Sequence, residues 1–80
     1  MEDSAVLKQI QELVDEEHHL LDRRSKGELE EHGHSRLGEV EIRLDQCWDL
    51  LRQRRAMRSV GEDPSHANVR DATTVERYQQ

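Results

Sequence analysis

Apolar residues recur along the first part of the chain with the spacing of an α-helix. If Leu7 is placed at position a of a heptad, the apolar residues fall at positions a, d and g, and Glu17 at a d position interrupts the stripe. Asp3 or Ser4 can cap the start of such a helix through a side-chain oxygen. The pattern predicts a helix over residues 4–24 whose apolar stripe consists of Val6, Leu7, Ile10, Leu13, Val14, Leu20 and Leu21.

A second helical pattern follows after a short break. Gly27 suits the left-handed residue that often ends a helix, and Ser25 with Glu28 fits the capping box that begins the next one. Gly61 marks the end of this second pattern. We therefore expect a helix over residues 28–60, whose apolar stripe consists of Leu37, Val40, Leu44, Cys47, Trp48 and Leu51.

Two helices joined by a short turn predict an all-α fold, an antiparallel helical hairpin. The whole chain, 1–80, is expected to form a single domain. In it, residues 61–80 form an extended, mostly irregular strap that ends in a short helix from about Thr74. Folding the chain back at the turn places Leu7 opposite Leu44.

The first helix is too short to cover the second, so the hairpin beyond Cys47 lacks a facing helix. Hydrophobic residues make up 32% of the chain and charged residues 38%, close to the composition at which chains fail to pack. We therefore predict that two hairpins form a four-helix bundle, with a homodimer favoured. In the alternative, the strap of the same chain covers Trp48. The expected centre of packing consists of Leu44, Cys47, Trp48 and Leu51.

The net charge of −6 argues against binding to nucleic acids or to anionic membranes, because both need a basic surface. No stretch approaches the roughly 18 apolar residues of a membrane span, and the N-terminus lacks the pattern of a secretory signal. The single cysteine excludes an intrachain disulfide. These features predict a cytoplasmic protein.

Histidines and glutamates give one candidate metal site. Glu16 with His19, and Glu31 with His34, match the Glu-x-x-His spacing with which helical bundles present metal ligands. In the heptad frame, however, His19 faces solvent and His34 lies on the flank, whereas ligands must face one another. We expect solvated side chains and no cofactor, with metal binding as an alternative.

A cluster of arginines near the end of the second helix is the most concentrated basic feature; it consists of Arg52, Arg54, Arg55 and Arg58. Guanidinium groups bind phosphate and carboxylate in bidentate fashion, so this basic patch is an alternative site for phosphate-bearing or acidic ligands. The simpler interpretation is that the arginines pair with Asp45, Asp49 or an acidic first helix. No aromatic residues are interleaved for base stacking.

Cys47 lies in the middle of a helix on the apolar stripe, where a small buried residue is expected instead of a reactive thiolate. The sequence also contains no glycine-rich phosphate loop and no nucleophile–base pair. We therefore expect a non-enzymatic protein that acts through oligomerisation or protein interaction.

Several segments together resemble a family of short actinobacterial proteins of unknown function. The block Glu39–Arg55, which contains LDQCWDLLRQRR, is the most specific of them. The similarity extends over nearly the whole chain, so it implies a small, mostly helical protein in which the strap belongs to the domain. It implies no activity and no catalytic residue. The other matching segments are Glu16-Glu17-His18 with Leu20, Gly61-Glu62-Asp63-Pro64, Val69-Arg70 and Val75-Glu76-Arg77-Tyr78.

Overall fold

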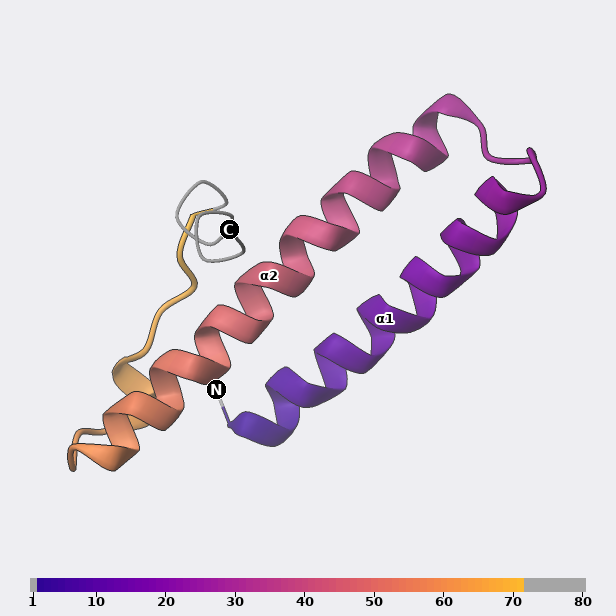
Figure 1. The fold of residues 1–80 in the computed structure, drawn as a ribbon. Helices are drawn as coiled ribbons and strands as arrows, with labels where there is room; N and C mark the ends of the chain where they lie inside the picture. Colours follow the sequence, from indigo (N-terminus) through magenta and orange to yellow (C-terminus); the bar gives the residue numbers. More distant parts are fainter. Residues whose placement is uncertain (1, 72–80) are drawn as a thin grey trace.

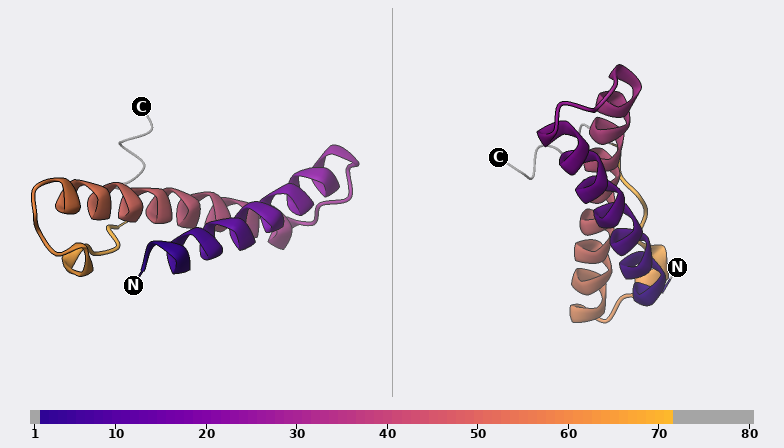
Figure 2. Two further views of the ribbon diagram at one scale, coloured as in Figure 1. Left: turned by 90° about the horizontal axis from the view of Figure 1, so that it is seen from below. Right: turned by 90° about the vertical axis from the view of Figure 1, so that its right-hand side faces the viewer.

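The computed structural model describes residues 2–71, which form two long helices and a short 3-10 helix. The elements are α1 (Asp3–Ser25), α2 (Glu31–Ser59) and η1 (Pro64–His66). α1 and α2 run antiparallel and cross at an angle, and α2 continues past the start of α1 (Figures 1 and 2). The predicted helical hairpin is therefore confirmed. The four-helix bundle stays a prediction, and the expected helix from Thr74 lies outside the described residues.

The turn between the helices begins as the sequence predicts and then differs. Gly27 has a φ of 71°, and the N–H of Glu28 donates to the carbonyl of Arg23 at 2.9 Å, which closes the end of α1. The prediction of a capping box is wrong. The Ser25 hydroxyl donates to the carbonyl of Asp22 at 2.7 Å and therefore does not cap the start of α2. An extended segment follows, so α2 begins three residues later than expected.

Leu29 explains this late start of α2. Its side chain packs against the core and lies directly over Gly33, where a Cβ would collide with a Leu29 methyl group. A helix beginning at Glu28 would carry Leu29 away from this position. Gly33 therefore lies directly under the Leu29 side chain.

The core lies along the seam between the two helices, and the structure corrects the expected orientation of α1. Leu7 is 46% exposed, so it does not pack opposite Leu44. The inward stripe of α1 contains Val6, Ile10, Leu13 and Leu20 instead. Asp3 shares this stripe and pairs with Arg54 of α2, and this ion pair favours the observed rotation of α1. The buried apolar residues of α2 are Leu37, Val40, Leu44, Cys47, Leu50 and Leu51.

The four residues of the expected packing centre differ in burial within the single chain. Leu44, Cys47 and Leu51 are buried within the single chain, as predicted, whereas Trp48 is 42% exposed. Trp48 follows Cys47 by one residue, about 100° further round the helix, and therefore points past α1. The overhanging end of α2 is covered by Asp3 and by residues 61–71 of the strap, and neither of these encloses the indole.

Replacing glycine by alanine should have opposite effects on stability at the turn and within α2. Gly27→Ala should lower the free energy of unfolding by about 1 kcal/mol, because a Cβ disfavours the positive φ. Gly38→Ala should raise it by about 0.5 to 1 kcal/mol, because Gly38 is an exposed helical residue whose Cβ would meet no neighbouring atom. Urea denaturation checks both values, and equal effects of the two substitutions would contradict the turn geometry.

Candidate interaction surface

Three sides of α2 have different surroundings. α1 covers one side, and the strap covers a second side, where residues 67–70 pass Gln46 and Gln53. The third side carries a stripe of residues at helical spacing: Glu41, Asp45, Trp48, Arg52 and Arg55. We call this stripe, together with Leu7 and Val14 of α1, the open face.

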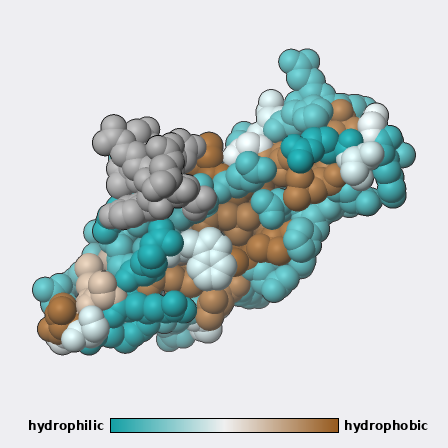
Figure 3. Space-filling view, in the orientation of Figure 1, coloured by the Kyte–Doolittle hydropathy of each residue, from teal (hydrophilic) through white to brown (hydrophobic). Residues whose placement is uncertain are grey.

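Apolar side chains gather on the surface along the seam between α1 and α2 (Figure 3). A shallow recess there is lined by Val14, Glu17, Glu41, Leu44, Asp45 and Trp48. Leu7 precedes Val14 by seven residues and therefore lies on the same side of α1. Leu7 and Trp48 are the large apolar residues most exposed within the two helices of the described chain. The open face is thus an apolar strip with charged residues at both ends.

The predicted basic patch does not exist as one cluster. Arg54 is only 8% exposed; its Nε donates to Asp3 Oδ1 at 2.5 Å, and its Nη1 donates to the carbonyl of Pro64 at 3.2 Å. Arg58 donates to the other Asp3 oxygen at 2.5 Å. These two arginines therefore join the start of α1, the end of α2 and the start of the strap. Arg52 and Arg55 remain together on the open face, and Arg52 also lies 4.0 Å from Asp49.

The two guanidinium groups, Arg58 first and then Arg54, lower the pKa of Asp3 from 3.8 to about 2. Because the folded pKa lies below the unfolded one, this carboxylate stabilises the fold above about pH 4. The stabilisation is lost as the pH falls from 4 towards 2. Urea midpoints measured across this range should fall less steeply for Asp3→Asn than for the wild type. Equal slopes would show that the pairs contribute nothing.

A second polar network, not predicted from the sequence, holds residues 68–70 of the strap. Asp49 is 2% exposed and accepts a hydrogen bond from Gln53 at 2.9 Å, and Arg70 Nε lies 3.4 Å from the same carboxylate. Gln46 and Gln53 donate to strap carbonyls, at Arg70 and Asn68. The sequence does contain a signal for this network: polar residues at positions 46, 49 and 53 have the spacing that places them on the same side of a helix.

The candidate metal residues do not converge. Glu16 forms a bidentate pair with Arg36, at 2.5 and 2.8 Å, and these hydrogen bonds lower the pKa of its carboxyl group. His19, Glu31 and His34 are exposed. Within residues 2–71, no group of three or more histidine, cysteine or acidic residues is arranged to hold a metal ion.

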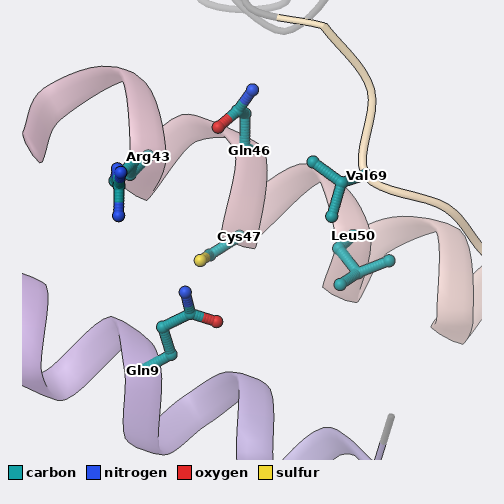
Figure 4. A pocket seen from close by; sticks show the side chains of 6 residues that line it. All are labelled: Gln9, Arg43, Gln46, Cys47, Leu50 and Val69. Carbon is teal, nitrogen blue, oxygen red and sulfur yellow. The ribbon is translucent and has the colours of Figure 1, made fainter. Parts of the chain in front are cut away.

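Cys47 lies in a pocket between α1, α2 and the strap (Figure 4). Its thiol points towards Gln9 of α1, and Val69 of the strap lines the other end. Burial raises the pKa of the thiol, and the nearby charge of Arg43 opposes this only in part. A buried, protonated thiol is a poor nucleophile, as expected for a core residue.

A family described as "Protein of unknown function (DUF2630)" matches residues 2–80. Uncharacterized proteins of Mycobacterium bovis and Mycobacterium tuberculosis are 51% identical to the chain over 77 residues, which is 95% of this chain and 88% of each relative. The resemblance to a short actinobacterial family is therefore confirmed. No solved structure matches the chain significantly. Within residues 2–71, neither long helix has an apolar stretch sufficient to cross a membrane.

Proposed function

Because the chain belongs to the DUF2630 family, whose function is unknown, we propose a function from its surface: a non-enzymatic self-association module. Two hairpins pack through their open faces into a four-helix bundle. The observation that carries this proposal is the exposure of Trp48, at 42%, together with that of Leu7 of α1, at 46%. A small chain gains stability when such side chains are covered.

The open face suits a second hairpin for three reasons. It is the side of α2 that α1 and the described strap leave uncovered. It is elongated, so two helices can lie along it as in a bundle. It also carries an aromatic residue with aliphatic neighbours, the composition typical of an interface centre.

The rest of the chain supports a structural role and a cytoplasmic location. Three of the side chains suited to chemistry are engaged within the fold: Cys47 is buried as a free thiol, and Arg54 and Glu16 are held in ion pairs. A free thiol suits a reducing compartment. Metal-dependent or phosphate-binding activity has no comparable observation in its favour.

Sedimentation equilibrium of the full chain tests the proposal. We expect the mass of a dimer at micromolar concentrations, with dissociation on dilution. A monomer at every concentration would contradict the proposal. In that case, a Trp48 emission spectrum typical of a buried indole would indicate that the chain's own C-terminal residues cover the open face.

A further inference from the structure

Along the open face, charged residues of opposite sign lie at nearly equal distances on the two sides of Trp48. Glu41 and Arg55 lie seven residues before and after it, and Asp45 and Arg52 lie three and four residues away. At 1.5 Å per residue, the outer pair lies about 10 Å on either side of the indole. Acidic residues therefore occupy one end of the open face and basic residues the other.

From this pattern we propose that the partner of the open face is a second copy of the chain, with the two α2 helices antiparallel and Trp48 at the two-fold axis. The inference rests on the proposed self-association and adds its register. A two-fold interface brings residue i of one copy to residue j of the other, and j to i. Glu41 then meets Arg55 of the second copy, and Asp45 meets Arg52, each contact occurring twice.

The surroundings of the stripe support this register. Glu17 of α1 lies beside Glu41 and Asp45 in the recess, so three carboxylates mark the acidic end. At the basic end, Arg54 and Arg58 pair with Asp3, whereas Arg55 lies exposed on the open face beside Arg52, which is 4.0 Å from Asp49. A parallel alignment of the same helices would instead place acidic residues against acidic ones, and like charges in contact oppose association.

The apolar residues fit the same arrangement. Each Trp48 would pack near its counterpart, with Leu7 and Val14 of both copies beside the crossing. These are the partly exposed apolar side chains of the open face. Charged ends around an apolar centre are the usual anatomy of a protein interface.

Charge exchange tests the register. Glu41→Arg alone and Arg55→Glu alone should each raise the dimer dissociation constant by about tenfold or more, because each places two like-charged pairs in the dimer. The double variant Glu41→Arg/Arg55→Glu should return to within about threefold of the wild type. These residues are 14 positions apart on one helix, so contact within the chain cannot produce the rescue.

Disulfide cross-linking in a Cys47→Ala background separates the two alignments. A mixture of Glu41→Cys and Arg55→Cys chains should form a cross-linked dimer, whereas Glu41→Cys alone should not. Self-cross-linking of Glu41→Cys, or a double variant as weak as the two singles combined, would overturn the antiparallel register. If the wild type dimerises but the variants give either of these results, the self-association proposal stands and the antiparallel register is wrong. A monomeric wild type would remove both.

Discussion

Trp48→Gln is expected to raise the dissociation constant of the dimer by about 100-fold or more, because a central aromatic residue carries much of an interface's energy and the dimer loses two. The fold of the single hairpin should hardly change. Trp48 is 42% exposed, so its replacement should cost the monomer less than about 1 kcal/mol. Sedimentation equilibrium measures the first quantity, and urea denaturation below the dissociation constant measures the second.

Two comparisons make this prediction specific. Val60→Gln removes another exposed apolar side chain, 71% exposed at the end of α2 and off the open face, and should leave dimerisation unchanged. Leu51→Ala should lower the free energy of unfolding by about 3 kcal/mol, because Leu51 is 1% exposed in the core. If Trp48→Gln behaved like Leu51→Ala in the monomer, Trp48 would be a core residue and the open face would be misassigned.

Arg54→Met should lower the free energy of unfolding by about 3 kcal/mol. The substitution keeps the aliphatic stem but removes the hydrogen bonds to Asp3 and to the Pro64 carbonyl. A hydrogen bond to a charged group contributes about 1.5 to 3 kcal/mol, and the second bond adds to this. Urea denaturation at neutral pH measures the loss.

Arg55→Met is the matched control for Arg54, since the neighbouring side chain is exposed. At concentrations where the chain is monomeric, it should change stability by less than about 0.5 kcal/mol. A double-mutant cycle with Asp3→Asn should show strong coupling to Arg54→Met, because both changes remove the same ion pair. Additive effects would mean that the pair does not join the two helices.

The hairpin was predictable because its signals are local. The heptad stripe of α2 and the glycines with positive φ at the two helix ends depend on residues close in sequence. The rotation of α1 was not predictable in this way. Its apolar surface is wide enough for either Leu7 or Val6 to face inward, and the pairing of Asp3 with Arg54, 51 residues away, favours Val6.

The interaction surface was predictable in part for the same reason. Periodicity placed Trp48 beyond the reach of the first helix and left open whether a second chain or the strap covers it. Trp48 and Cys47 are adjacent, so a heptad pattern accommodates either as the inward residue. The strap could not be placed from its own polar sequence, because its contacts depend on Asp49 and Gln53 of α2.

The fluorescence of Trp48 on dilution tests the central claim most directly, because it is the only tryptophan of the chain. If a second copy covers the open face, its emission should shift to longer wavelength as dilution separates the dimer, following the same curve as the mass. An emission maximum that stays constant while the mass halves would show that the chain associates through another surface.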